Sequence, residues 1–359
     1  MTYKLMLKSP EVSVATLIFA ISLMIASAAC QANFEFVPLP FLAPVSEENP
    51  STPEKISLGK QLFFDPRLSI DGTISCNSCH NLKGNGTDSR STSVGVYGQL
   101  GSRSAPTVWN AAFLSSQMWD GRISTLEEQA KGPILNPVEM AMPHEQAAVD
   151  RIAAISGYVE QFERIFGGDQ PVSYDNIAKA IAAFERTLIT PNSRFDQYLR
   201  GNHTALTRKE KHGMDTFKDL GCIRCHRGPA LAGPVLPNGE AFLQWFPAHS
   251  SQYDDEYKLK EDLGYNNGKE HFLEVRRGKW RVPTLRNIAL TAPYFHNGSV
   301  KTLNKAVRVM ARAQLNRDLT DYEADVLVAF LETFTGEFQV IIPPILPADD
   351  TAEVVQLNQ

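Results

Sequence analysis

The sequence predicts a mainly α-helical fold of two related halves, packed together, with long loops and little β-structure. Three observations support this fold class. Apolar residues recur at helical spacing in several segments, and strand-like alternation is scarce. The pentapeptide Cys-x-x-Cys-His also occurs twice, at Cys76–His80 and Cys222–His226, each time behind a segment of helical character. A chain of 359 residues is long enough for two domains of ordinary size.

The first half is predicted to alternate helices with one long loop. After a Pro-rich, polar lead-in over residues 31–58, the segment Leu58–Phe64 begins a short helix ahead of the first pentapeptide. Asn81–Ser104 is rich in Gly, Ser and Thr and predicts a loop that folds over the group bound by the pentapeptide. Glu145–Phe166 and Tyr174–Leu188 carry apolar residues at helical spacing, which predicts amphipathic helices.

The second half is predicted to begin after Pro191-Asn192-Ser193, whose residue types favour a boundary. This places the two domains at residues 31–190 and 191–340. Thr207 followed by Glu210 has the form of a capping box, in which each side chain bonds the other's backbone N–H. A helix is therefore expected to start there and to run into the second pentapeptide.

The remainder of the chain contains fewer signals. Residues 227–281 are polar and aromatic without a clear period, so they predict a long irregular connection. Two helices are expected near Thr302–Ala313 and Asp321–Phe334. Residues 341–359 contain several prolines and aspartates and predict an extended tail.

The amino terminus predicts export. Lysines precede an uncharged run, Val12–Ala29, so residues 1–30 have the form of a targeting segment. Ala26-Ser27-Ala28 fits a signal-peptidase site, whereas Cys30 also fits a lipoprotein signal, and the run is nearly long enough to remain as an anchor. Each alternative predicts a periplasmic protein, which touches a membrane only through a lipid on Cys30 or an N-terminal anchor.

Each pentapeptide supplies two thiols for covalent attachment of haem and an imidazole for its iron. A zinc site favours clustered cysteines or a second paired histidine, and a redox dithiol leaves the trailing histidine unexplained. Two covalently bound haem c groups are therefore predicted, and the net charge of −5 without a basic stripe excludes a nucleic-acid partner. The attachment residues are Cys76, Cys79, Cys222 and Cys225, and the iron ligands are His80 and His226.

Beyond these motifs, residues 50–335 resemble the bacterial di-haem cytochrome c peroxidases, a family related to the methylamine-utilisation di-haem enzymes. The signatures that carry the resemblance are Ala105-Pro106-Thr107, Trp119-Asp120-Gly121-Arg122, Gln129, Pro137-Val138-Glu139-Met140, Pro283-Thr284-Leu285-Arg286-Asn287 and Thr291-Ala292-Pro293-Tyr294-Phe295-His296-Asn297-Gly298. The resemblance implies two cytochrome c-like haem domains. The amino-terminal domain would be peroxidatic and the carboxy-terminal domain would transfer electrons.

The resemblance also implies catalytic roles. Glu139 matches the carboxylate that moves a proton between the peroxide oxygens, which the departure of water requires. Gln129 matches an amide that forms hydrogen bonds in the same pocket. Trp119 matches an aromatic residue between the two haems that assists electron transfer.

For the second haem, the resemblance implies that Met310 is the axial ligand opposite His226. A thioether ligand stabilises ferrous iron and raises the reduction potential, which suits a haem that receives electrons. The methylamine-utilisation enzymes use a tyrosine at this position. Met310 therefore favours a peroxidase over that related class of oxidase.

One departure from the family pattern concerns the loop after the first haem. Family members place a histidine in Ser-x-Gly-His, where it caps the peroxidatic iron in the oxidised enzyme. Here Val96 stands in its place, and valine cannot ligate iron. We expect the oxidised first haem to be open without reductive activation; Tyr97 and His144 are the alternative ligands.

A second departure concerns calcium. The family holds a calcium ion between its domains, and Thr291 and Pro293 match the carbonyl donors. Ser104 replaces the family's asparagine, and a hydroxyl is a weaker calcium ligand than an amide oxygen. Calcium is therefore an expectation that this substitution weakens.

The sequence as a whole predicts a di-haem peroxidase that reduces hydrogen peroxide to water. The resemblance implies a small periplasmic cytochrome c or cupredoxin as electron donor, and a homodimer. Two alternatives remain. One is a related di-haem oxidase that modifies a protein or an organic substrate. The other is a non-catalytic electron-transfer cytochrome, which would leave Gln129 and Glu139 without a role.

Overall fold

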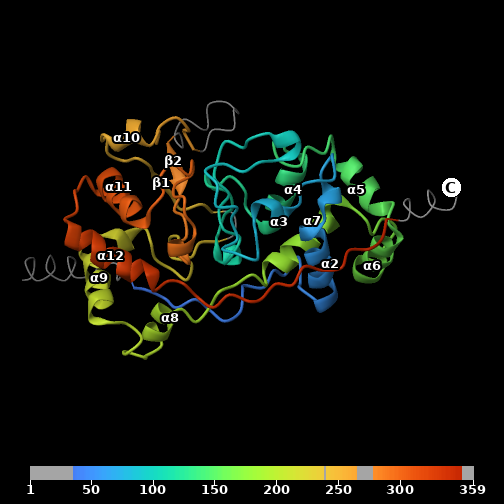
Figure 1. The fold of residues 1–359 in the computed structure, drawn as a ribbon. Coiled ribbons are helices and arrows are strands. Elements are labelled where there is room, and N and C mark those ends of the chain that lie inside the picture. The colour runs from blue at the N-terminus through green and yellow to red at the C-terminus, as the bar shows by residue number, and fades with distance from the viewer. Residues whose placement is uncertain (1–34, 238–239, 265–277, 350–359) are drawn as a thin grey trace, which may run out of the picture. The chain divides into compact units, whose positions relative to one another are not determined.

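Helices dominate the part of the chain that the structure describes, so the predicted fold class is confirmed (Figure 1). The structure is a computed structural model that describes residues 35–237, 240–264 and 278–349. The predicted targeting segment with Cys30, and the last residues of the predicted tail, lie outside these ranges. None of the described helices combines the length and the apolar character needed to cross a bilayer.

The elements follow the chain in the order shown in Figure 1. The α-helices of the first half are α2 (Pro53–Phe64), α3 (Cys76–Cys79), α4 (Leu126–Leu135), α5 (Glu145–Ala153), α6 (Ser156–Phe166) and α7 (Tyr174–Glu185). Those of the second half are α8 (Arg194–Leu199), α9 (Arg208–Asp219), α10 (Tyr253–Glu256), α11 (Leu303–Leu315) and α12 (Asp321–Glu332). Short 3₁₀ turns are η1 (Pro66–Leu68), η2 (Val96–Gly98), η3 (Ala111–Phe113), η4 (Cys222–Arg224) and η6 (Ile288–Leu290). Strands β1 (Leu243–Trp245) and β2 (Lys279–Arg281) pair antiparallel, with Gln244 opposite Trp280.

Local capping signals locate several of these helices. The predicted capping box at Thr207 and Glu210 is present at the start of α9. Helices α8 and α12 begin with similar capping boxes. The predicted helical segment Glu145–Phe166 is divided into α5 and α6 because Ile155 adopts an extended conformation. Helices α3, α4, α8 and α10 were not predicted, and α10 lies in the segment 227–281 that was expected to be irregular.

Each half is built on a close crossing of two helices at a glycine. Helix α2 crosses α7 where Gly59 lies against the carbonyl oxygen of Ala180, and α9 crosses α12 where Gly213 lies against that of Val326. A Cβ atom at either glycine would overlap that oxygen, so both contacts require the absence of a side chain. The same packing device is therefore used once in each half.

Gly213→Ala is expected to lower the free energy of unfolding by about 1–3 kcal/mol, because the added methyl forces α9 away from α12. Chemical denaturation of the haem-loaded protein measures the change. Asp215→Ala, at an exposed position of the same helix, is the control and should change the free energy by no more than about 0.5 kcal/mol. Equal effects of the two variants would show that the crossing is not tightly packed.

Separate hydrophobic cores lie in the two halves. One contains Leu58, Phe63 and Phe184, and another contains Phe195 and Phe330. The chain from Phe36 onward nevertheless forms one contact unit, so the boundary near Pro191 stays a prediction.

A further repeat joins the halves. Residues 105–125 and 282–302 share a Pro-Thr pair, an Asn, a Gly and a Thr at equal spacing. Asn110 and Asn287 both adopt left-handed backbone angles, with φ of 67° and 61°, and both are buried. Their side-chain amides donate to the hydroxyl oxygen of the same residue, Thr190, at 2.8 and 2.9 Å. Equivalent positions of the two halves therefore meet around one buried threonine.

The two ends of the described chain cross over between the halves (Figure 1). Phe36 packs edge-on against Phe195, and the backbone N–H of Leu39 donates to Asp196 at 2.8 Å. In the opposite sense, Phe338 and Ile341 pack against the core of the first half. Residues 341–349 contain neither helix nor strand. Each half is thus partly covered by a terminal segment that belongs, in sequence, to the other.

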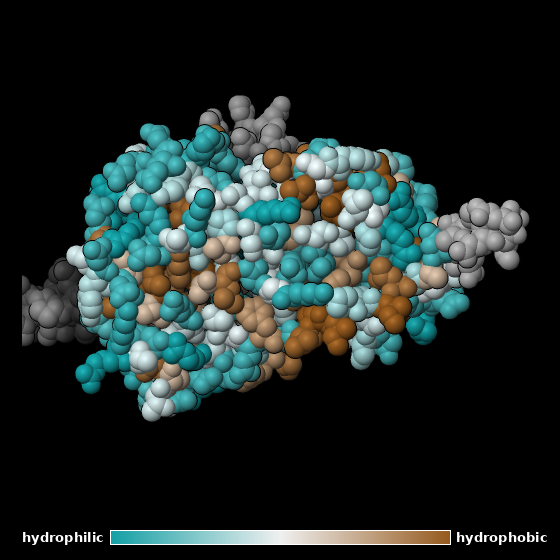
Figure 2. All heavy atoms as spheres, viewed as in Figure 1, coloured by the Kyte–Doolittle hydropathy of each residue, from teal (hydrophilic) through white to brown (hydrophobic). Residues whose placement is uncertain are grey.

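These terminal segments also expose apolar side chains. In Figure 2 hydrophobic residues gather along the face over which both segments run in Figure 1, whereas most of that view is hydrophilic. The exposed apolar residues of the two segments are Val37, Phe41, Leu42, Val45, Val340, Ile342 and Ile345.

Candidate functional site

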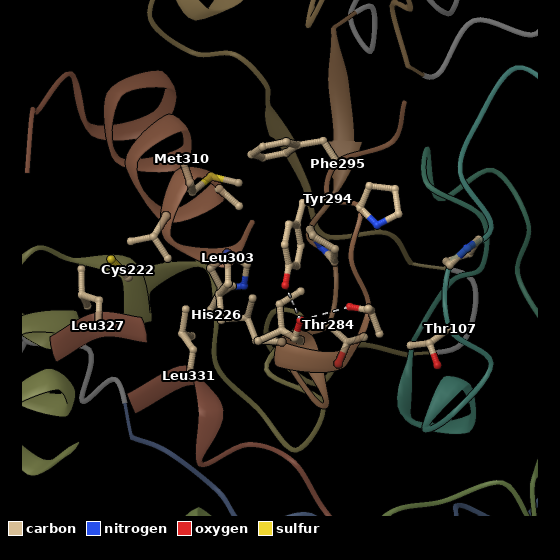
Figure 3. Close-up of a pocket in the computed structure, with 18 of the residues that line it drawn as sticks. Thr107, Cys222, His226, Thr284, Tyr294, Phe295, Leu303, Met310, Leu327 and Leu331 are labelled. Carbon is tan, nitrogen blue, oxygen red and sulfur yellow. Dashed lines mark hydrogen bonds between the residues drawn. The ribbon is translucent and has the colours of Figure 1, made fainter. Parts of the chain in front are cut away.

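Two large cavities lie next to the two pentapeptides. The first is lined by Cys79 and His80 and contains about 1610 Å³ of space free of protein atoms, part of it open to solvent. The second is lined by Cys222 and His226 and contains about 1270 Å³ (Figure 3). Each cavity therefore adjoins the histidine and one cysteine of its pentapeptide, where a haem attached to that motif would lie.

The two motif histidines are held in the same way. Nδ1 of His80 lies 3.3 Å from the carbonyl oxygen of Gly86, and Nδ1 of His226 lies 3.1 Å from that of Leu231. A hydrogen on Nδ1 would donate to this oxygen and leave Nε2 as a free acceptor, as iron ligation requires. Burial lowers the pKa of both imidazoles, that of His226 to about 4, so both are neutral near pH 7.

A threonine anchors the loop that carries each of these carbonyl groups. The Thr107 hydroxyl donates to the carbonyl oxygen of Asn85 at 2.7 Å, and that of Thr284 donates to Ala230 at 2.6 Å. Thr107 and Thr284 are equivalent residues of the internal repeat. The support behind each candidate iron ligand is therefore duplicated, which fits one haem in each half.

In the second cavity, Met310 lies on α11 and lines the same space as His226 (Figure 3). Phe295 and Tyr294 form part of the apolar wall, and the Tyr294 hydroxyl donates to the carbonyl oxygen of Ile288 at 3.1 Å. The Tyr294 hydroxyl is thus engaged in a hydrogen bond. Met310, whose thioether sulfur can ligate haem iron, is the better candidate for a second ligand beside His226. The structure thus brings together His226 and Met310, as the sequence predicted.

Gln129 and Glu139 line the first cavity together with His80. Gln129 is on α4, and Glu139 follows the end of that helix. Asn136 donates its side-chain N–H to Oε1 of Glu139 at 2.7 Å. Burial raises the pKa of Glu139, and this effect exceeds the opposing influence of Asn136 and Arg122. A raised pKa makes this carboxylate a stronger proton acceptor than an exposed glutamate, which suits a group that accepts and returns a proton.

Pro133 also lines the first cavity, and sequence reasoning missed it. The spacing of the internal repeat continues into α4 and α11, where Pro133 occupies the position that corresponds to Met310. Proline has no atom that can ligate iron. The repeat could have revealed this difference from the sequence, and it indicates that the first cavity has no iron ligand at the position equivalent to Met310.

Trp119 lines both cavities. Its indole Nε1–H donates to the carbonyl oxygen of Ser104 at 2.8 Å, which fixes the ring between the two sites. This placement matches the predicted position of an aromatic residue between the haems. Its role in electron transfer stays a prediction.

Val96 is fully buried and does not line the first cavity. Its backbone N–H donates to the carbonyl oxygen of Glu139 at 2.9 Å, and the preceding Gly95 lies so close to Val138 and Glu139 that a Cβ would clash. The loop therefore packs on the backbone of the candidate catalytic segment. Position 96 therefore presents no imidazole or other iron ligand to the cavity.

The two alternative ligands lie elsewhere. Tyr97 is exposed, and the exposed His144 caps α5 by accepting the backbone N–H of Ala147 at its Nδ1. Neither residue lines the first cavity.

The candidate calcium residues Ser104, Thr291 and Pro293 share the wall of the second cavity. The Ser104 hydroxyl donates to the carbonyl oxygen of Arg90 at 3.3 Å. Within the described ranges, no cluster of three or more His, Cys, Asp or Glu side chains could hold a metal ion. Any calcium bound here would therefore rely on carbonyl, hydroxyl and water oxygens.

Glu185 is an additional buried carboxyl on the first cavity, which sequence reasoning missed. It is 4% exposed, and its Oε2 has no hydrogen-bond partner among the described residues. Burial raises its pKa to about 8, despite the nearby Arg186. Its carboxyl is therefore mostly protonated at pH 7.

This raised pKa predicts a loss of stability with rising pH. Between about pH 4.5 and 8 the unfolded chain releases the Glu185 proton while the folded chain keeps it, so the unfolding free energy falls by about 1.4 kcal/mol per unit. Glu185→Gln should remove this loss, and denaturation at pH 5 and pH 8 measures it. Glu160→Gln, at an exposed site, is the control; an unchanged pH profile in Glu185→Gln would contradict the prediction.

Comparisons with known proteins agree with this geometry. The sequence profile of the di-haem cytochrome c peroxidases matches residues 53–204. The cytochrome c551 peroxidase of Nitrosomonas europaea is 43% identical over 335 residues, covering 93% of this chain and 94% of that protein. That of Pseudomonas aeruginosa is 40% identical over 321 residues, covering 89% of each.

More distant similarities lie with MauG and a MauG-like protein. The methylamine utilization protein MauG of Methylorubrum extorquens is 32% identical over 319 residues, covering 86% of each chain. The crystal structure of a MauG-like protein associated with microbial copper homeostasis has a TM-score of 0.68 and 30% identity. It covers 86% of this chain and 95% of that one.

Proposed function

Because this chain belongs to the di-haem cytochrome c peroxidase family, we propose that it reduces hydrogen peroxide to water with electrons from a small carrier protein. The reaction consumes one peroxide, two electrons and two protons and releases two waters. The observation that carries the proposal is the partly buried Glu139 carboxyl in the cavity of His80, where Pro133 and not an iron ligand stands at the position of Met310.

Iron bound to His80 would supply the site at which peroxide binds and receives electrons. Glu139 accepts a proton from the nearer peroxide oxygen at its carboxylate and delivers it to the farther one, so that this oxygen leaves as water. Asn136 orients the carboxyl through its bond to Oε1. Gln129 offers an amide to hold the peroxide oxygens in line.

The second cavity supports electron transfer. His226 and Met310 would hold its iron, and the thioether would raise the reduction potential. Electrons from a small cytochrome c or cupredoxin would be received there and pass by Trp119 to the first site. Covalent attachment would use the four pentapeptide cysteines, none of which forms a disulfide.

Further parts of the proposal rest on the sequence and the family. The protein is periplasmic, carried there by its amino-terminal segment, with Cys30 as a lipid site if that cysteine is retained. It functions as a homodimer of chains that each contain two haem domains, divided near Pro191. Calcium binds beside Ser104, Thr291 and Pro293.

The first experiment is an EPR and visible spectrum of the oxidised protein, with peroxide turnover assayed before and after half-reduction. A high-spin ferric haem beside a low-spin one, with immediate turnover, is expected because Val96 and Pro133 leave the first iron open. Two low-spin haems with turnover only after half-reduction would show that another residue caps the iron. Two low-spin haems without turnover in either state would indicate an electron carrier.

A further inference from the structure

A buried arginine lies between the two haem cavities. Arg281 ends strand β2, is 6% exposed and lines both the first and the second cavity. Its Nε–H donates to the carbonyl oxygen of Met118 and its backbone N–H to that of Trp119, each at 3.0 Å. The guanidinium is therefore fixed beside the indole that separates the two sites.

This cation lacks an anionic partner within the described ranges. The other deeply buried arginine, Arg286, is paired with Asp196 at 2.8 Å. Arg281 forms no salt bridge with a described residue. The carboxylate that influences its charge, Asp120, already forms salt bridges with Arg103 and Arg122 at 2.7 Å each. A buried charge without a partner is strongly destabilising, so an anion is expected beside it.

Burial lowers the pKa of Arg281 to about 10, so the side chain remains charged at neutral pH. Two of its five N–H groups donate to backbone oxygens, those of Met118 and Val282. The remaining three can bind one carboxylate through two hydrogen bonds and a second carboxylate through one. Haem carries two propionate carboxylates, and the planar fork of arginine binds carboxylates with two parallel hydrogen bonds.

We propose that Arg281 binds a propionate carboxylate of the haem in each cavity and so raises the reduction potentials of both haems. The inference rests on the proposed binding of two haems. A cation beside a haem disfavours the ferric state, which carries one more positive charge than the ferrous state. One side chain would therefore favour reduction at both sites, and the repeat places only an uncharged residue, Ser104, at the equivalent position.

The test is a spectroelectrochemical titration of Arg281→Gln and Arg281→Lys, with each haem followed by its own absorption bands. In Arg281→Gln both reduction equilibria should shift toward ferric by about tenfold, which is about 59 mV for a one-electron couple. Arg281→Lys keeps the charge and should shift each by less than about threefold. Arg122→Gln, which removes a charge lining only the first cavity, is the matched control and should shift the first haem alone.

A shift at one haem only, or at neither, in Arg281→Gln would overturn the proposal, as would equal shifts in the Gln and Lys variants. Haem content is measured first, since a wild type without two haems would contradict the proposed function instead. If Arg281→Gln fails to mature, infrared redox-difference spectra of wild type and Arg281→Lys carry the test. Guanidinium bands should respond to reduction of either haem in the wild type and vanish in Arg281→Lys; bands that persist would overturn the proposal.

Discussion

Glu139→Gln is expected to lower the turnover of hydrogen peroxide by about 100- to 10,000-fold while leaving both haem spectra unchanged. Glutamine keeps the size of the side chain and can still bond Asn136, but it cannot accept a proton from one peroxide oxygen and return it to the other. Stopped-flow reduction of peroxide by the protein measures the loss. Glu145→Gln, at an exposed site on α5, is the matched control. Activity within tenfold of wild type would exclude Glu139 as the proton carrier.

The pH dependence gives a second readout of the same residue. Glu139 must be ionised to accept the first proton, and burial raises its pKa above the ordinary value of 4.5. The rate should therefore fall on the acidic side at a pH above 4.5. In Glu139→Gln this acidic limb should disappear; a limb that persists would belong to another group.

Met310→His should lower the reduction potential of the second haem by on the order of 100 mV or more, since axial ligands set haem potentials over a range of about 0.8 V. Imidazole stabilises ferric iron more than a thioether does. Turnover with a small electron donor should fall more than tenfold, because the donor can then reduce this haem only weakly. Potentiometric titration and donor-coupled turnover measure the two effects.

Met214→Leu provides the control for this substitution. Met214 is a buried methionine on α9 that lies in a hydrophobic core and lines neither cavity. Leucine conserves its volume, so both potentials should remain unchanged. If Met310→His leaves the potential of the second haem unaltered, Met310 is not its ligand.

The sequence predicted those parts of the fold that depend on local signals. The capping box at Thr207 and the apolar periods of α7, α11 and α12 act over a few residues, so their helices were placed within a few positions. Helix α4 was missed because Gly132 and Pro133 disfavour a helix locally. Its apolar face packs against α7, and tertiary contacts therefore outweigh local propensity.

The site divides in a similar way. The two pentapeptides identify His80 and His226 as candidate iron ligands. The family resemblance adds Glu139, Gln129 and Met310 to the candidate site. Arg281 could not be found from the sequence, because its importance depends on lying between two cavities built from distant segments. The support by Thr107 and Thr284 was equally hidden, since the repeat that relates them preserves only a few residues.

The crossed terminal segments have a consequence for handling and proteolysis. A chain cut at the junction near Pro191 is expected to migrate as one particle, because each fragment would still bind the terminal segment of the other. Phe36 would stay among the aromatic residues of the second half, and Phe338 and Ile341 on the core of the first. The two halves are thus held together by two crossing terminal segments. A single break in the connecting chain would therefore leave the distance between the two cavities unchanged.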